Sequence, residues 1–197
     1  MSTSEKTTRR DLVLRLSLTG GALALGNLGV AGTAGAATST ALTADSRQAL
    51  SRLYADNQKA KTLGSLATGV LVFPHIVKAG LAIGGQSGQG ALLLPTGAEP
   101  SHFYKITAAS FGLQIGAQSF CYVLFLMNQK AMTYLEEADG WSIGVGPTIA
   151  VLDKGAAANL DTSTLREDVY AIAFGQKGLM AGITLDGSRI ARIHPKP

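Results

Sequence analysis

Hydrophobic and polar residues follow two different periods along this chain. Between Asp45 and Thr62, apolar residues recur at about 3.6-residue spacing, which predicts an amphipathic helix. From Gly69 onward, short apolar runs alternate with glycines and polar residues every 8–12 residues or so, a pattern typical of antiparallel strands. The pattern predicts an α+β fold that is mostly β. We expect an antiparallel sandwich or barrel-like sheet with an N-terminal amphipathic helix and one or two short helices.

The predicted helix has one apolar and one charged face. Thr43 or Asp45 is a suitable N-cap, and Gly64 follows the last turn. Two interpretations remain open: the helix packs on the sheet, or it lies on a membrane. The apolar face is thin and has neither Trp nor Phe, which favours packing on the sheet. The apolar face carries Ala49, Leu50, Leu53, Tyr54 and Ala60, and the polar face carries Arg47, Gln48, Arg52, Asp56 and Lys59.

The strand-like runs are short and separated by turn signals. Asp186-Gly187 is a suitable two-residue hairpin turn. A short helix is expected after Asn128 as N-cap, with Ala131, Met132 and Leu135 on one face, and a second helical segment within 153–166. The predicted strands are 69–73, 90–94, 102–110, 111–118, 121–127, 141–145, 147–152, 168–175, 178–185 and 188–193.

Residues 1–37 have the composition of an export signal. A charged start precedes a glycine-interrupted apolar stretch, and Ala34 and Ala36 supply the small residues of a cleavage region. Arg9 and Arg10 resemble the arginine pair of a twin-arginine signal, which exports folded proteins. We therefore expect a protein that is exported folded and is periplasmic or secreted, with a peripheral membrane location left open. The domains expected are the signal at 1–37, a linker at 38–44 and one folded domain at 45–197.

Half of the net positive charge of the chain belongs to this leader. The formal net charge is +4, and the leader holds four basic and two acidic residues, so the leader and the rest each contribute +2. Such a mild balance does not indicate a nucleic-acid-binding protein. Cys121 is the single cysteine and lies in an apolar run, so we expect it to be buried, with no disulfide and no cysteine-cluster metal site.

The densest motif is the glycine-rich segment 74–90, which contains Lys78. Neither the Walker phosphate-binding order nor the dinucleotide-binding glycine spacing is present. Two interpretations remain. Glycines in strands mark bulges or close backbone approach, and converging backbone N–H groups beside Lys78 would hold an anion.

The catalytic inventory is sparse. His75, His102 and His194 have no metal-ligand spacing, and we expect no metal and no cofactor. A serine hydrolase built from Ser87 or Ser119 with His75 or His102 is the least favoured function. Triad residues can be distant in sequence, so the pattern leaves this function open, but nothing here singles these residues out.

The motif order resembles that of the SYLF domain, a family of lipid-binding and actin-regulating proteins. The resemblance covers roughly residues 45–193. It rests on four groups of residues: Gly69-Val70-Leu71-Val72-Phe73-Pro74 with Lys78-Ala79-Gly80-Leu81; Gly84-Gly85-x-x-Gly88-x-Gly90; Gly112 to Gln118 with Val123-Leu124; and Gly144 to Pro147 with Tyr170 to Ser188.

This resemblance implies a non-enzymatic protein that binds phospholipid headgroups or a membrane surface. Eukaryotic members bind phosphoinositides in part through an N-terminal amphipathic helix. The helix predicted at 45–62 matches that helix by position, so the resemblance implies that it contacts a membrane. An actin partner is not expected in an exported protein. The alternative function is an envelope protein-interaction module that binds by strand addition at a sheet edge. The residues inferred to contact lipid are Lys78, Gly84, Gly85, Gly88, Gly90, Arg47, Arg52 and Lys59.

Overall fold

The computed structural model describes residues 37–197 except 82, 101, 112–115, 138–139, 153–164, 179–184 and 186. These residues belong to one compact unit, Ala36–Pro197. The expectations for the export signal, including Arg9, Arg10, Ala34 and Ala36, lie outside the described residues. So do nearly all of the helical segment expected within 153–166 and the strand expected at 178–185.

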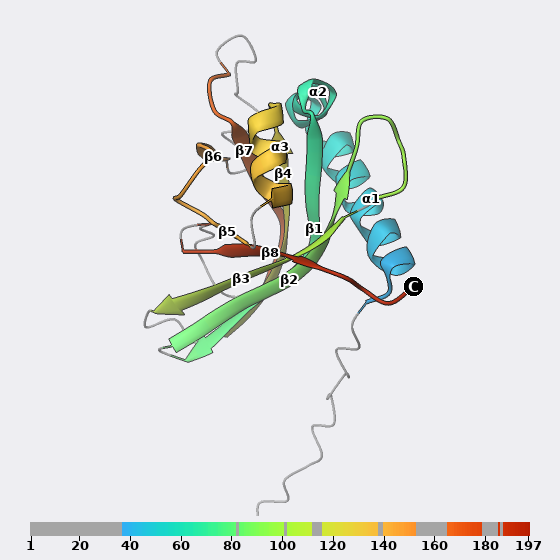
Figure 1. The fold of residues 1–197 in the computed structure, drawn as a ribbon. Helices are drawn as coiled ribbons and strands as arrows, with labels where there is room; N and C mark the ends of the chain where they lie inside the picture. The colour runs from blue at the N-terminus through green and yellow to red at the C-terminus, as the bar shows by residue number, and fades with distance from the viewer. Residues whose placement is uncertain are drawn as a thin grey trace, which may run out of the picture. The chain divides into compact units, whose positions relative to one another are not determined.

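Within the described residues, an eight-stranded sheet forms the centre of the domain and curls as it twists (Figure 1). Every pair of neighbouring strands is antiparallel except β6 and β7, which are parallel. The predicted mostly β, antiparallel α+β class is confirmed. In the order β5-β8-β3-β2-β1-β4-β7-β6, the strands are β1 Gly69–Leu81, β2 Ile83–Leu93, β3 Phe103–Phe111, β4 Gly116–Leu126, β5 Trp141–Ser142, β6 Ile149–Leu152, β7 Val169–Gly178 and β8 Arg189–Ile193.

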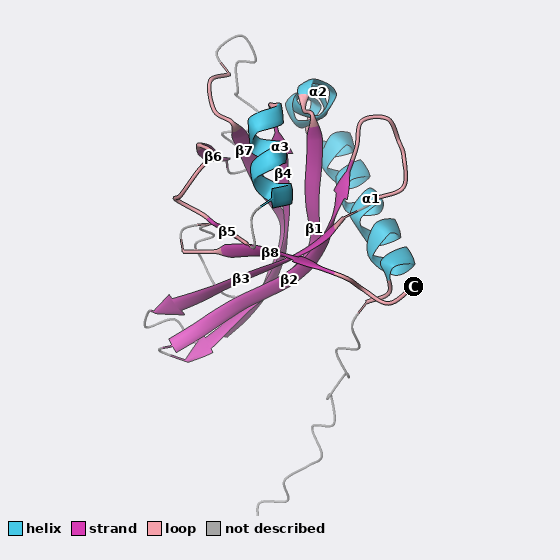
Figure 2. Cartoon of the chain, in the orientation of Figure 1, coloured by secondary structure: helices cyan, strands magenta, loops and turns pink. Residues whose placement is uncertain are grey.

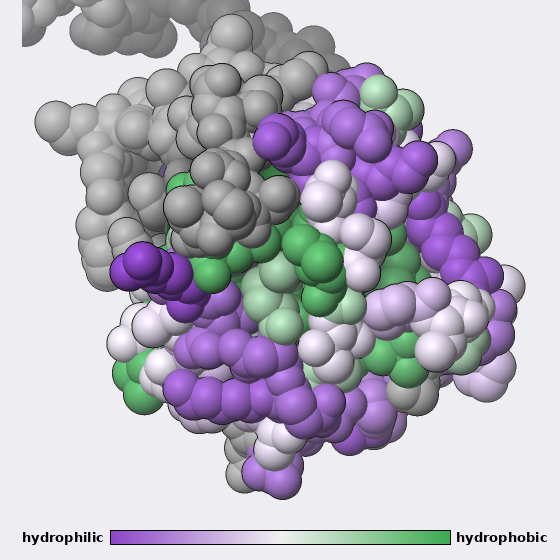
Figure 3. Space-filling view, turned by 90° about the horizontal axis from the view of Figure 1, so that it is seen from above, coloured by the Kyte–Doolittle hydropathy of each residue, from purple (hydrophilic) through white to green (hydrophobic). Residues whose placement is uncertain are grey.

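In the described residues, helices lie on both faces of this sheet (Figure 2). Helices α1 (Ser39–Asp56) and α2 (Gln58–Leu66) pack on one face, and α3 (Gln129–Glu137) packs on the other. Seen from above, the domain shows hydrophobic surface bordered by hydrophilic residues (Figure 3). None of the helices in the described part of the chain is long and apolar enough to span a bilayer.

Side chains of β1 and β4 alternate between two buried clusters. Val72 and Val123 point toward α1 and α2, whereas Leu71 and Leu124 point toward the cluster that includes α3. Two opposite faces are therefore buried at the same strands, which explains why these runs are continuously apolar rather than alternating.

The N-terminal helix differs from the expected one at both ends. Thr38 caps α1 by accepting a 3.2 Å hydrogen bond from the Ala41 N–H, so segment 38–44, expected as a linker, is helical from Ser39. The helix stops at Asn57, whose side chain accepts a 3.0 Å hydrogen bond from the Ala60 N–H and starts α2. One helix over 45–62 was therefore wrong, because Asn57 is extended and caps a second helix.

The short helix after Asn128 is confirmed. The Asn128 side chain accepts a 2.9 Å hydrogen bond from the Ala131 N–H, and Ala131, Met132 and Leu135 are buried. The glycine-rich residues Gly84–Gly90 lie in a strand, since they belong to the first part of β2. The predicted strand at 121–127 begins earlier than expected, since β4 already starts at Gly116.

A bulge interrupts β1 at Pro74. The register with both neighbouring strands shifts between Val72 and Ile76. Proline lacks the N–H that a central strand needs, so it is tolerated where the ladder is broken. As a result Phe73 and Ile76, three positions apart, join the same cluster, and the alternation of β1 is reversed beyond the bulge.

Candidate functional site

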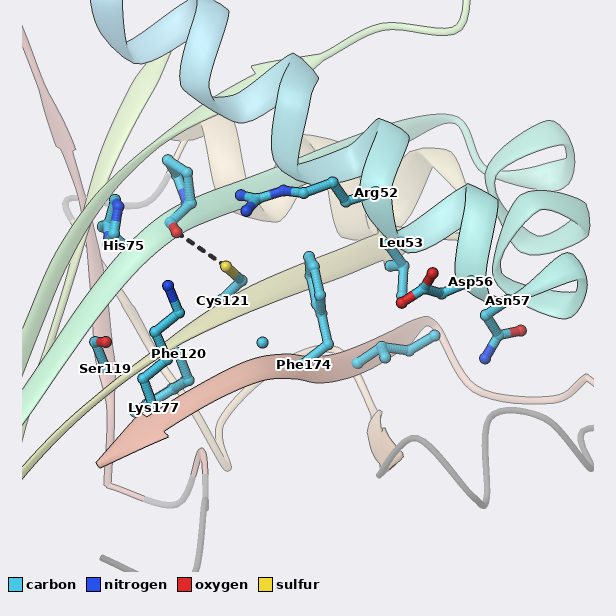
Figure 4. Close-up of a pocket in the computed structure, with 13 residues that line it drawn as sticks. Arg52, Leu53, Asp56, Asn57, His75, Ser119, Phe120, Cys121, Phe174 and Lys177 are labelled. Atoms are coloured by element: carbon cyan, nitrogen blue, oxygen red, sulfur yellow. Dashed lines mark hydrogen bonds between the residues drawn. The ribbon is translucent and has the colours of Figure 1, made fainter. Parts of the chain in front are cut away.

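A pocket of about 340 Å³ lies between the C-terminal end of α1 and the sheet (Figure 4). Helix α1 contributes Arg52, Leu53 and Asp56, and Asn57 closes one end. The rest of the wall comes from three adjacent strands: Pro74 and His75 of β1; Ser119, Phe120 and Cys121 of β4; and Ile172, Phe174, Gly175 and Lys177 of β7.

The pocket exists because the strands on both sides of β4 carry bulges at the same level. Pro74 marks the bulge in β1, and the register between β4 and β7 shifts beside Cys121. Gly175 in β7 has a φ of +66°, a left-handed conformation that favours glycine and is found in bulges. Bulges bend strands and redirect side chains. Both bulges lie in the part of the sheet that lines this pocket.

Cys121 lies between these two bulges. It is buried, as its apolar context predicts, and its thiol donates a 2.9 Å hydrogen bond to the carbonyl oxygen of Pro74. The thiol thus satisfies a backbone acceptor at the bulge, where the register with the neighbouring strands shifts.

Positive charge converges on Cys121 from two elements. Burial raises the pKa of the Cys121 thiol, while the charges of Arg52 on α1 and Lys177 on β7 act to lower it. Figure 4 shows both cationic side chains directed toward this end of the pocket, with His75 beside them. An anion placed near Cys121 would therefore be held by Arg52 and Lys177 from opposite walls.

The same pocket also has apolar lining from Leu53, Ile172 and Phe174. Figure 4 shows Phe174 between Cys121 and Leu53, with Asp56 and Asn57 at the end away from His75. An arrangement of a few charged groups beside apolar side chains is characteristic of ligand sites. This one suits a molecule with an anionic head and an apolar body.

The cationic residues expected to contact lipid do not share one surface. Arg52 lines the pocket, whereas Arg47 lies elsewhere on α1 and pairs with Glu99 at 3.1 Å. Lys59 is exposed on α2. Lys78 follows Ile76 by two positions and so faces the α3 side of the sheet, between Gln86 and Gln118 on the neighbouring strands.

The glycines of the motif lie together along β2, outside the pocket. A Cβ on Gly90 would overlap the carbonyl oxygen of Val72, and one on Gly88 would lie 2.7 Å from the carbonyl oxygen of His75. Both glycines therefore allow β2 to approach the bulge of β1, which supports the close-approach interpretation. Gly85 is exposed, and a Cβ there would make an ordinary 3.5 Å contact. Gly84 pairs with Gly80 of β1.

Sequence reasoning missed Lys177 as a site residue. It follows the family motif residues Phe174-Gly175-Gln176, and the glycine with the bulge conformation stands two positions before it. The motif was therefore visible, but the bulge that turns Lys177 toward Cys121 depends on pairing with β4, which no local pattern reveals.

The described residues form a β-rich domain with a pocket between α1 and the sheet. In the part of the chain that is described, no group of three or more His, Cys, Asp or Glu residues could hold a metal ion. Residues 107–194 match the family model Ysc84, described as a Las17-binding protein actin regulator. This match confirms the predicted SYLF domain for residues 107–194, and the motifs before residue 107 lie outside the matched range. No curated protein matches the chain.

Proposed function

We propose that this protein binds anionic phospholipid without catalysing a reaction. The phosphate would lie near Cys121 between Arg52 and Lys177, and the apolar part of the lipid would contact Leu53, Ile172 and Phe174. The observation that carries the proposal is the convergence of two cations from different elements on one end of a partly apolar pocket. Charge-assisted hydrogen bonds to phosphate are among the stronger polar contacts.

A soluble short-chain lipid tests the pocket directly. We would titrate dihexanoyl phosphatidic acid, below its micelle concentration, into the full chain by calorimetry. Arg52→Gln and Lys177→Gln are each expected to weaken binding about tenfold, since a hydrogen bond to a charged group contributes about 1.5–3 kcal/mol. Arg47→Gln is the matched control, because it removes the same charge from the same helix outside this pocket.

Two further ligands separate the sources of the anion. Glycerol phosphate offers the headgroup alone, and dihexanoyl phosphatidylcholine offers the apolar chains with a neutral head. The proposal expects the anionic lipid to bind more tightly than either. Equal binding of glycerol phosphate would reduce the site to a phosphate site, and equal loss in Arg47→Gln and Arg52→Gln would contradict a role for the pocket.

Export is a second part of the proposal. The arginine pair Arg9-Arg10 and the small residues up to Ala36 support delivery of a folded domain to the periplasm or beyond by the twin-arginine route. Changing Arg9 and Arg10 together to lysine should leave the protein in the cytoplasmic fraction of a host with this pathway. Unchanged export of the variant would contradict the route.

A serine hydrolase remains the competing function because Ser119 and His75 line the same pocket. In the described residues, however, no hydrogen bond joins the two side chains, and Figure 4 places Asp56 toward the opposite end of the pocket. Incubation with a serine-reactive phosphonate distinguishes the two functions. The lipid-binding proposal expects no covalent adduct, and an adduct on Ser119 would favour the hydrolase.

A further inference from the structure

The face of the sheet that α1 and α2 cover is exposed at β1 beyond the bulge. Near Val72 and Leu93 this face is buried under α1 and α2. Past the bulge in β1, the same face carries His75, Val77 and Ala79, and all three are exposed. We call the uncovered part of this face, from β8 across to β7, the open strip.

Cross-strand pairing defines the open strip residue by residue. Residues directly opposite each other in paired strands have side chains on the same face. The row through Val77 crosses six strands, and a second row through Ala79 runs parallel to it. In order from β8 to β7, the first row is Arg189, Thr107, Ser87, Val77, Ser119 and Lys177, and the second row is Ala109, Gly85, Ala79 and Ala117.

All the charges on the open strip are positive. Arg189 and Lys177 lie at its two ends, and Lys105 lies opposite Gln89 in the row through His75. The rows contain no acidic residue. Between the cations, Val77 exposes 53% of its surface, whereas the large apolar residues of β1 before the bulge are buried.

The open strip is continuous with the lipid pocket. Ser119 and Lys177 belong to the row through Val77 and also line the pocket. His75 likewise lies on the open strip and lines the pocket. We infer that the open strip rests on an anionic lipid surface and so presents the pocket to it. This inference rests on the proposed function and adds the surface by which the domain docks.

Charge and shape favour a lipid surface over other occupants. Each basic residue held close to an anionic bilayer strengthens binding about fivefold, and this attraction decays within a Debye length. Cations spread over several strands with short side chains between them match a broad, laterally uniform anionic layer. A protein partner or a second copy of the chain would instead protect Val77 without lipid.

A tryptophan placed on the open strip reports contact with acyl chains. We would prepare Val77→Trp in the full chain and add vesicles of phosphatidylglycerol and phosphatidylcholine in equal parts, with brominated acyl chains. Val151→Trp is the matched control, since Val151 is similarly exposed, at 45%, but pairs with Ala171 and faces the α3 side. Trp141 is 1% exposed and contributes the same background to both.

The inference expects quenching in Val77→Trp and not in Val151→Trp, and about fivefold weaker vesicle binding in Lys105→Gln than in Lys59→Gln. All variants carry the same residues 1–37, so binding by that segment is common to them. Equal quenching of the two introduced indoles, or none in a vesicle-bound Val77→Trp, would overturn the docking surface while leaving the pocket proposal standing. Loss of short-chain lipid binding in the unsubstituted chain would overturn both.

Discussion

The thiol of Cys121 donates a 2.9 Å hydrogen bond to the carbonyl oxygen of Pro74, and this bond joins the bulge of β1 to β4 beneath the two cations of the pocket. Burial raises the pKa of Cys121, and Arg52 and Lys177 partly oppose this rise. Thiolate is the reactive form of cysteine. The reactivity of Cys121 therefore reports the charge at the centre of the proposed site.

Removing either cation should slow alkylation of this thiol. Without Arg52 or Lys177, the pKa of Cys121 rises further, less thiolate is present at a fixed pH, and reaction with iodoacetamide becomes slower. Mass spectrometry follows the rate in Arg52→Gln and Lys177→Gln. Arg47→Gln should react at the unsubstituted rate, and a slowing as large as that of Arg52→Gln would show that the two arginines are not distinguished at Cys121.

An occupied pocket should protect the same thiol. Dihexanoyl phosphatidic acid is expected to slow alkylation in the unsubstituted chain, because the lipid would cover the only cysteine of the sequence. In Arg52→Gln the protection should need about tenfold more lipid. Lipid binding without any change in the alkylation rate would place the lipid outside this pocket.

Substitutions at three glycines of β2 distinguish a packing role from a role in ligand contact. Gly88→Ala and Gly90→Ala each place a methyl group against the backbone of β1, so we expect about 1–3 kcal/mol less stability in urea unfolding. Gly85→Ala has room for its methyl group and should change stability little. If Gly88→Ala or Gly90→Ala lost lipid binding at unchanged stability, the glycines would contact the ligand after all.

Asp168 connects three segments and should make stability depend on pH. Its carboxylate accepts hydrogen bonds from the Thr148 N–H at 3.0 Å and the Asn128 side chain at 2.7 Å, and Lys130 lies 3.5 Å away. The Thr148 backbone bond, then the Asn128 bond, lower the pKa of Asp168. A lowered folded pKa adds stability above the unfolded pKa, and this stability is lost as pH falls through the folded value.

Asp168→Asn should therefore cost about 1–3 kcal/mol at neutral pH and less in acid. The difference from the unsubstituted chain should shrink below about pH 4, where the unfolded carboxyl takes up a proton. Urea unfolding at several pH values measures it. Glu137→Gln removes an exposed carboxyl of α3 and serves as the control. A gap that stayed constant into acid would mean that Asp168 acts without its charge.

Local sequence patterns predicted the individual helices and strands better than the way these elements pack on one another. The cap at Asn128 and the buried face of α3 follow from residue types a few positions apart, and both are confirmed. Asn57 ends the first helix although the apolar period continues through it. Its side chain hydrogen-bonds to a backbone N–H as a cap, and this competes with a helical conformation at Asn57 itself. Whether Arg47 or Arg52 lies at the pocket depends on which face of α1 packs against the sheet.

The candidate site depended on long-range pairing. Pro74 and Gly175 are 101 positions apart by their numbers, and only the pairing of β1 and β7 with β4 places their bulges on either side of Cys121. Lys78 illustrates the opposite case. Its motif is specific, but the bulge reverses the alternation of β1 and directs Lys78 away from the face that carries Arg52.

Two charge-matched double variants test the central claim most directly. Arg52→Gln with Lys177→Gln, and Arg47→Gln with Lys59→Gln, each remove two positive charges and leave residues 1–37 unchanged. We would measure the affinity of each full chain for dihexanoyl phosphatidic acid by calorimetry. The pocket account predicts that the first pair abolishes measurable binding and the second preserves it. Equal losses in the two pairs would show that net charge, rather than the pocket, determines lipid binding.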